Sequence, residues 1–208
     1  MKKITCVAIA VFFVSVTAFA QTTTFEAVCA RLAAHQNTTG NFTQVRKIVK
    51  ANRSLTSSGT FIFSLDGIMW KTLKPFPSSL VVGMTSVIQI TPDGKKTVID
   101  ASNNQIFTSI STTLSSVFSG NTKKLYESFA VNFSASGNAW KAVCTPKDKT
   151  VAAVMQSLEI GGTTTQTDAE FSTIVMTDAN GDTTTYTFTN QKYPKELSAD
   201  EKAVFTAK

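Results

Sequence analysis

The chain has 208 residues, 16% of them charged and 42% hydrophobic, with a formal net charge of +6. Its lysines are scattered, and its arginines are Arg31, Arg46 and Arg53. Nucleic-acid-binding surfaces usually cluster Arg and Lys on one face with aromatic residues between them. We therefore expect no nucleic-acid partner. The mild basicity favours solubility, with weak attraction to anionic lipid surfaces.

The first twenty residues have the pattern of a cleavable signal peptide. Lys2 and Lys3 form a positive start, residues 4–16 are almost wholly apolar, and residues 18–20 read Ala-Phe-Ala before Gln21. The alternative is an uncleaved membrane anchor, but the apolar stretch is short for a bilayer span. The sequence predicts a signal peptide over residues 1–20 and a single domain over 21–208, exported to a periplasm.

The N-terminal part of the mature chain has helical spacing. Over residues 24–36, Phe25, Val28, Cys29 and Leu32 would share one face, and Thr24 can cap the first turn. From residue 41 to about residue 100 the period changes to two, which is typical of strands. An Asp-Gly turn at residues 66–67 and a Pro-Asp-Gly turn at 92–94 divide this part. We expect six antiparallel strands in a meander.

The middle of the chain returns to helical spacing. Residues 104–119 carry apolar side chains at i, i+3, i+4 and i+7 on a Ser/Thr-rich background, and Gly120 ends the pattern. A helical turn or two over residues 122–129 precedes five more strands, the last two joined by Asn180-Gly181. The tail is polar, with Leu197, Val204 and Phe205 as candidate docking points. Ten or eleven strands with few helices indicate a strongly curved sheet or incomplete barrel with helices over one side.

No catalytic or metal-binding pattern is evident. His35 is the single histidine and lies near the end of the first helix, six residues after Cys29 and so not on its face. Asp66, Asp93, Asp178 and Asp182 fall in predicted turns, where Asp serves turn geometry. The sequence therefore predicts neither an enzyme nor a cofactor.

Two cysteines remain after the signal peptide, Cys29 and Cys144. In an oxidising compartment they can form a disulfide, and the alternative is two buried thiols that never meet. The sequence leaves both readings open. The 15 phenylalanines, five methionines and two tryptophans are equally ambiguous, because they suit a plain core as well as a cavity.

The order of short motifs along the mature chain resembles the periplasmic outer-membrane lipoprotein carrier family, LolA. The motifs are "NFTQVRK", "SSGTFIFS", "GIMWK", "PFPSSLVVG", "WKAVCTPKD" and "DANGDTTTYTFTN". The most specific of them are Phe42-Thr43-Gln44, the Gly59 strand leading to Trp70, and the Thr145-Pro146-Lys147 that ends the strand containing Trp140.

The resemblance implies an unclosed antiparallel β-barrel of about 10–11 strands, covered by a helical lid over a hydrophobic cavity. It implies a carrier, acting as a monomer, that accepts acyl chains of lipoproteins from an inner-membrane transporter and delivers them to an outer-membrane receptor. A lipid-sensing regulatory module of the same fold, which delivers nothing, is the alternative. The implied cavity wall comprises Phe61, Phe63, Ile68, Trp70, Leu80 and Val82, and the lid contributes Phe107, Ile110, Leu114 and Phe118.

One position departs from the family pattern. The resemblance implies an arginine that latches the lid shortly before a proline leading into the Trp, but this chain reads Ser64-Leu65-Asp66 there. The departure weakens lipoprotein as the cargo and leaves acyl-chain binding intact. A glycolipid or another acylated product is therefore also a candidate cargo.

Overall fold

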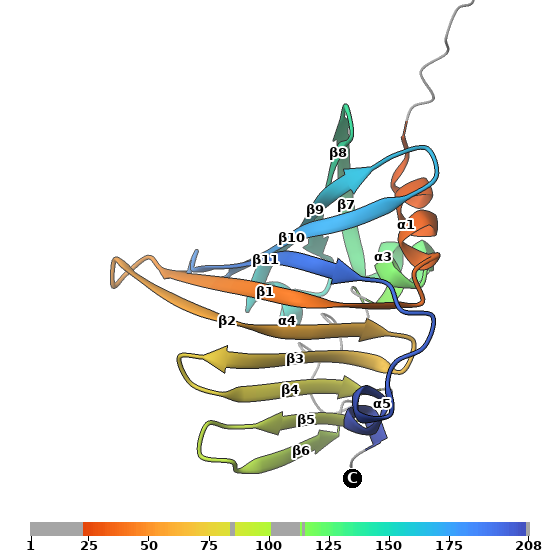
Figure 1. The fold of residues 1–208 in the computed structure, drawn as a ribbon. Helices are drawn as coiled ribbons and strands as arrows, with labels where there is room; N and C mark the ends of the chain where they lie inside the picture. The colour runs from red at the N-terminus through yellow and green to blue at the C-terminus, as the bar shows by residue number, and fades with distance from the viewer. Residues whose placement is uncertain (1–22, 84–85, 101–112, 114, 207–208) are drawn as a thin grey trace, which may run out of the picture.

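The computed structural model describes residues 23–83, 86–100, 113 and 115–206, and eleven antiparallel strands form its single sheet (Figure 1). The strand order is β6-β5-β4-β3-β2-β1-β11-β10-β9-β8-β7. The strands are β1 (Asn37–Ile48), β2 (Arg53–Ser64), β3 (Gly67–Lys74), β4 (Ser78–Gly83), β5 (Ser86–Ile90), β6 (Lys96–Asp100), β7 (Phe129–Ser136), β8 (Ala139–Pro146), β9 (Met155–Thr164), β10 (Ala169–Asp178) and β11 (Thr183–Lys192). The helices are α1 (Phe25–Ala33), α3 (Thr122–Ser128), α4 (Lys149–Ala152) and α5 (Ala199–Thr206).

The sheet consists of two meanders that meet where β1 pairs with β11. Strands β9 and β10 rise steeply from the β1–β6 half, so the sheet wraps partly around itself (Figure 1). It does not close, because β6 and β7 each lack a second strand partner among the described residues. The predicted unclosed antiparallel sheet is therefore confirmed, including the turns at residues 66–67 and 180–181.

Helices α1, α3 and α4 each contribute buried side chains to the core on the concave face. Thr24 caps α1 as predicted, since its hydroxyl accepts the N–H of Ala27 at 3.2 Å. The apolar face of α1 is buried in the concave core, which it shares with Leu125 of α3. Residues 115–118 are helical as well, and Gly120 at φ +71° follows them. The predicted stop at Gly120 is confirmed in this part of the chain.

The C-terminal helix α5 packs on the opposite, convex face. Leu197 is buried there in a separate cluster with Ile62 and Met69, and Val204 and Phe205 pack against the same cluster. The predicted docking of the tail is therefore confirmed, although its helix was not predicted. The missed signal is a capping box, in which the N–H of Ser198 donates to Glu201 at 2.8 Å and that of Glu201 to the Ser198 hydroxyl at 3.3 Å.

The short helix α4 was also missed. Asp148 caps it by accepting the N–H groups of Thr150 and Val151 at 2.8 and 3.0 Å. Within the described ranges, no helix is long and apolar enough to span a membrane.

Candidate functional site

The six strand residues assigned to the cavity wall lie on one face of the sheet. Two cross-strand rows contain them: Phe61 opposite Trp70 opposite Leu80, and Phe63 opposite Ile68 opposite Val82. All six belong to or pack against the concave core. The intervening residues Ile62, Met69 and Val81 face the convex cluster instead. Because side chains alternate along β2, β3 and β4, one complete set of apolar side chains lies on the concave face of the sheet.

A chamber of about 270 Å³ lies on this concave face. Its inner wall is apolar, and uncharged polar side chains gather near the loops that follow β3 and β5. None of its described lining residues carries a formal charge. The lining consists of Phe42, Gln44, Ile68, Trp70, Thr72, Ser78, Ser79, Leu80, Val82, Gln89, Ile90, Leu158, Ile174, Met176 and Tyr186.

Aromatic rings fill the concavity beside this chamber. Phe118, from the helical segment at residues 115–118, packs against both Phe63 and Phe171 with ring centroids 4.7 Å from each. Phe61 and Phe188 continue the cluster at 4.9 Å from one another. Phe118 therefore occupies part of the apolar hollow. The other residues assigned to the lid, Phe107, Ile110 and Leu114, lie outside the described residues.

A second cavity of about 370 Å³ lies on the other side of the Ile68–Val82 pair. Phe63 and Phe118 line it together with Ser115, Ser116 and Ser119. Ile68 and Val82 line both cavities, so among the described residues these two side chains lie between the two hollows. The second cavity is less apolar than the chamber, because His35, Gln36 and Lys124 also line it.

Among the described residues that line the chamber, Trp70 alone has a fully buried side-chain polar atom without a hydrogen-bond partner. Its Nε1 is buried and donates to no acceptor among the described residues. A buried donor without an acceptor costs about 1–3 kcal/mol. Nearby, Tyr186 lies 6.0 Å from the Trp70 ring, and burial raises the pKa of its hydroxyl. The chamber is therefore dry enough to penalise charge, and it retains a free hydrogen-bond donor.

Helix α1 is fastened to the β9–β10 loop rather than to the β2–β3 turn. Arg31 donates to the Gln166 carbonyl and to the Thr164 hydroxyl at 3.1 and 3.0 Å. His35 Nε2 lies 2.7 Å from Asp168 Oδ1. These contacts agree with the interpretation of His35 as a partly exposed residue at a helix end.

Where the family resemblance implied a latch arginine, before Gly67, this chain forms a tight turn. The Ser64 hydroxyl donates to the Gly67 carbonyl and accepts the N–H of Asp66, both at 3.2 Å. This turn is self-contained. Within the described residues, it gives no hydrogen bond to the helices.

Cys29 and Cys144 are free thiols, and both are fully buried in the concave core. Burial raises the pKa of each thiol to about 12. No group of three or more metal-ligating side chains occurs in the described part of the chain.

A larger hollow of about 1210 Å³ lies on the convex face beside α5. Lys71, Lys96, Lys192, Asp200 and Glu201 line it together with apolar residues. These five ionisable side chains make it a poorer environment for hydrocarbon than the concave chamber, because charges resist removal from water.

Sequence reasoning missed the part of the concave surface that comes from β1, β9, β10 and β11, both the chamber wall and the aromatic cluster beside it. Tyr186 and Phe188 alternate in "TYTFTN" and were open to detection by their period of two. Phe171 and Ile174 were harder to find, because a bulge between Phe171 and Thr173 changes which face the following residues occupy.

Comparisons with known proteins agree with this architecture. The model of the family "Outer membrane lipoprotein carrier protein LolA" matches residues 34–206. An uncharacterized conserved protein from Thermus thermophilus has a similar structure, with a TM-score of 0.50 at 10% identity over 84% of this chain and 90% of that one.

Two further solved structures are similar at lower scores. A putative outer membrane lipoprotein-sorting protein domain from Vibrio parahaemolyticus has a TM-score of 0.46 at 12% identity, covering 87% of this chain and 97% of that one. A LolA superfamily protein from Nitrosomonas europaea has a TM-score of 0.46 at 9% identity, covering 85% and 94%. No curated protein sequence matches the chain. Since the family model spans most of the chain and the sheet is open and antiparallel as that resemblance implied, this protein belongs to the LolA family.

Proposed function

We propose that this protein is a periplasmic carrier that shields the acyl chains of a lipoprotein or another lipid during transfer from the inner to the outer membrane. Residues 1–20 would serve as the signal peptide that exports the single domain formed by residues 21–208. An inner-membrane transporter would load the monomeric carrier, and an outer-membrane receptor would unload it. The observation that supports this proposal best is the uncharged chamber with an apolar inner wall on the concave face.

Transfer energetics explain why such a chamber is useful. Exposing an acyl chain to water costs about 0.8 kcal/mol per methylene, or about 12 kcal/mol for a sixteen-carbon chain. A carrier must shield most of that chain and still release it. The chamber of 270 Å³ lies near the lower end of ligand-sized pockets, which span about 300–1,000 Å³. A full chain would therefore have to displace Phe118 and enter the second cavity.

Displacement of Phe118 would keep the affinity moderate. The ring makes apolar contacts in the empty protein that a tail must replace, so the ligand gains only the difference between the two states. The Nε1 of Trp70 would donate to the carbonyl that links each acyl chain to its head. These two features suit an acylated cargo that is held and later passed on.

The test is binding of a fluorescent fatty-acid probe to the purified protein. Leu80→Glu places a carboxylate on the chamber wall and should abolish saturable binding. Val98→Glu makes the same change at an edge-strand residue that is 55% exposed, and it should leave binding unchanged. Circular dichroism of both variants controls for folding. Equal binding by a folded Leu80→Glu variant would contradict the proposal.

A transfer assay separates the carrier from a sensor. Donor vesicles that contain the acylated probe are mixed with acceptor vesicles, and the rate of probe transfer is measured with and without the protein. A carrier accelerates transfer in proportion to its concentration. A sensor binds the probe and leaves the rate unchanged. His35→Ala should abolish neither measurement, because His35 lines the second cavity rather than the chamber and contacts Asp168 and Tyr193.

A further inference from the structure

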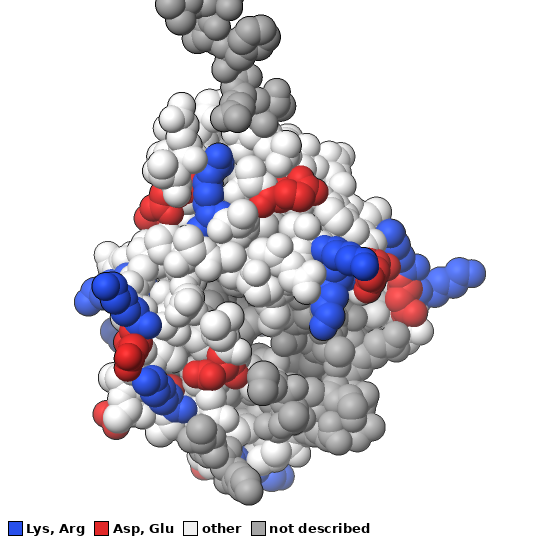
Figure 2. Space-filling model, turned by 90° about the vertical axis from the view of Figure 1, so that its right-hand side faces the viewer, with Lys and Arg blue, Asp and Glu red and all other residues white. Residues whose placement is uncertain are grey.

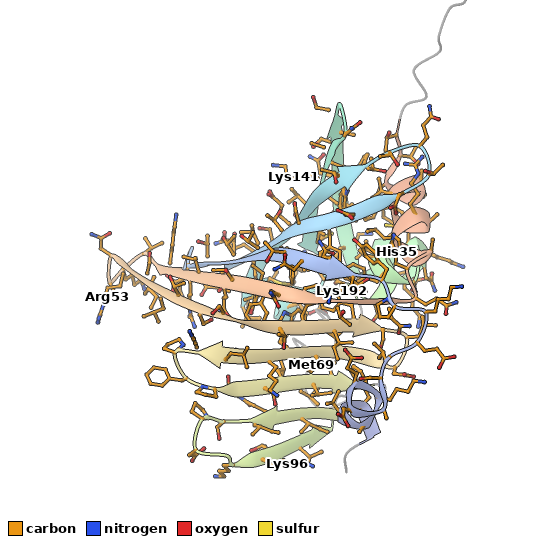
Figure 3. All side chains as sticks on the ribbon, in the orientation of Figure 1. His35, Arg53, Met69, Lys96, Lys141 and Lys192 are labelled. Carbon is orange, nitrogen blue, oxygen red and sulfur yellow. The ribbon has the colours of Figure 1, made fainter. Side chains whose placement is uncertain are left out.

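Three hairpin loops meet at the end of the sheet opposite α1 and α5. They join β1 to β2, β3 to β4 and β5 to β6, and all three lie at the left of Figure 1. Figure 3 places Arg53 at this end and His35 at the helix end. Segments 47–53, 73–77 and 91–95 contain five basic residues and one acidic residue, Asp93. We call the five basic residues the basic tip: Lys47, Lys50, Arg53, Lys74 and Lys95.

The cations of the basic tip are exposed, and within the described residues none has an acidic partner within 4.0 Å. The neighbouring acids are already engaged. Asp182 pairs with Arg46 at 3.8 Å and accepts the N–H of Val49 at 2.9 Å. Asp93 accepts hydrogen bonds within its own loop, from Thr91 at 2.5 Å and from the Lys95 N–H at 3.3 Å. The β10–β11 turn beside this hairpin adds Asp178, whose carboxylate accepts the N–H groups of Asn180 and Asp182, so the tip carries an excess of positive charge over these acids.

The opposite end of the molecule lacks this separation of charge. Figure 2 shows the face that carries α1 and α5, where basic and acidic side chains lie among uncharged ones. Sequence reasoning found no cluster of cations, because the five residues come from three segments spread over almost fifty positions. Only the pairing of the strands brings these loops to one end.

Exposed apolar side chains stand among the cations. Phe76 is 70% exposed in the β3–β4 loop, with Leu73 at 47%. Val49 is 61% exposed and Leu55 is 53% exposed in the β1–β2 hairpin. Apolar side chains flanked by Lys and Arg suit a surface that enters the headgroup region of an anionic bilayer, where each nearby cation contributes about tenfold or less in affinity.

The tip also adjoins the mouth of the concave chamber. Thr72 and Ser78 pair with each other beside the β3–β4 loop, and both line the chamber. On β2, Leu55 lies at the same parity as Ser57 and Phe61, so it extends the concave face outward from the tip. A tail leaving the chamber at this end would emerge between the exposed apolar side chains.

We propose that the basic tip, together with Phe76, Leu73, Val49 and Leu55, docks this protein on an anionic lipid bilayer with the chamber mouth facing the membrane. The proposed docking surface does not depend on the carrier role, whereas its connection to the chamber rests on the proposed function. The charge and the exposed aromatic ring supply the affinity, and the hairpins set the orientation. Docking would shorten the path over which a tail meets water.

Cosedimentation with vesicles tests the proposal. The purified protein is mixed with vesicles of phosphatidylcholine alone or of equal parts phosphatidylcholine and phosphatidylglycerol. We expect binding to the anionic vesicles that weakens as salt is added. Lys50→Gln with Arg53→Gln should weaken it by about 30-fold, from about 1 kcal/mol per charge. Phe76→Ser should weaken it by about tenfold.

Matched control variants stand at the opposite end. Lys123→Gln with Lys195→Gln removes the same charge from exposed positions, and Leu65→Ser alters a side chain that is 67% exposed in the β2–β3 turn. Both should bind anionic vesicles like the unaltered protein. Equal binding to the two kinds of vesicle would overturn the proposal, as would equal losses of vesicle binding in the tip and control variants. The proposal would also be overturned if this protein bound no vesicles but was retained on an immobilised acidic protein.

The fatty-acid probe assay is run on the same variants without vesicles. Tip variants that lose vesicle binding and keep probe binding support docking as a separate property. Loss of probe binding by Leu80→Glu with vesicle binding intact locates a failure in the chamber alone. The two proposals can therefore fail independently of each other.

Discussion

At the scale of single residues, Trp70 combines two properties that a plain core residue would not need. Its ring centroid lies 5.2 Å from that of Phe63, and the ring lines the chamber, so Trp70 forms part of the apolar wall. Its Nε1 is buried without an acceptor in the described structure. Trp140 makes an instructive contrast, because its Nε1 donates to the carbonyls of Thr163 and Glu170 at 3.0 and 3.2 Å. The fold therefore supplies hydrogen-bond acceptors for the Nε1–H of Trp140 and leaves the Nε1–H of Trp70 available.

The Trp70→Phe substitution keeps an aromatic ring and removes the donor. We expect the stability of the empty protein to stay the same or rise slightly, because an unsatisfied buried group is lost. Affinity for an acyl ester probe should fall about tenfold, as for loss of one hydrogen bond, while affinity for a plain alkane should persist. Thermal melts and probe titrations measure both. Equal losses for ester and alkane would show that only the shape of the ring matters.

The two buried thiols make a second residue-scale prediction. With pKa values raised to about 12, only about one thiol in ten thousand is ionised at pH 8, so a thiol reagent should label neither Cys29 nor Cys144 in the folded protein. Denaturation without reductant should expose two reactive thiols. If instead reductant were required before labelling, the pair would be bridged.

The same pKa shifts predict how stability depends on pH. Both folded values lie above the ordinary value of 9.0, so burial of the neutral thiols contributes fully below pH 9. That contribution is lost as the pH rises from 9 toward 12. Chemical denaturation of Cys29→Ser and Cys144→Ser variants across this range should show a shallower decline than in the unaltered protein.

At the scale of elements, the helical segment at residues 115–118 differs from α1. Helix α1 is fastened at its end by Arg31 and His35 to the β9–β10 loop. The 115–118 segment instead contributes Phe118, held by ring packing against Phe63 and Phe171. Ring packing contributes only about 0.5–1.5 kcal/mol per pair beyond burial. A tail can therefore replace Phe118 more easily than it can dislodge α1.

We accordingly expect Phe118→Ala to bind an acyl probe more tightly than the unaltered protein. Removing the ring destabilises the empty state by about 3 kcal/mol and ends its competition with the tail. Phe118→Leu keeps an apolar side chain in the hollow, so its affinity for the probe should lie between those of the unaltered protein and of Phe118→Ala. Probe titration and urea denaturation provide the measurements. Weaker binding by the alanine variant would identify the ring as part of the ligand's support.

At the scale of the whole molecule, the curvature of the sheet creates the chamber, and two glycines permit it. Gly59 lies at a register shift between β2 and β3, and a Cβ there would stand 1.9 Å from the Lys71 carbonyl oxygen. Gly162 lies beside the β9–β10 shift, and a Cβ there would stand 1.9 Å from the Glu170 carbonyl oxygen. Bulges with glycine allow adjacent strands to approach and bend.

Gly59→Ala and Gly162→Ala should each lower the melting temperature by several degrees, because backbone must move in both. Gly161→Ala is the matched control, since its Cβ would meet only a side-chain oxygen at 3.1 Å and a carbonyl at 3.4 Å. Differential scanning calorimetry compares the three variants. If all three variants had the same melting temperature, these contacts would not govern the curvature.

Local pattern was sufficient to predict the strands and most turns, whereas the inward set on β2, β3 and β4 came from the family resemblance, because consecutive apolar residues such as Phe61, Ile62 and Phe63 leave both faces of these strands apolar. Alternation with a period of two fixes which side chains share a face, and Asp66-Gly67 fixes the register of that hairpin. The resemblance of ordered motifs supplied the family. The wall from β9 and β10 was not predicted because the bulge after Phe171 breaks the alternation. Helix α5 was overlooked because it is short and only half of its residues are apolar.

The kind of sheet follows from local periodicity and the family from the order of motifs, so the sequence alone was enough for both. The tertiary structure was needed to show which apolar side chains face the hollow, that Phe118 fills part of it, that Trp70 keeps a free donor and that five distant cations share one end. Those properties depend on contacts between segments far apart in the chain, which no local pattern encodes.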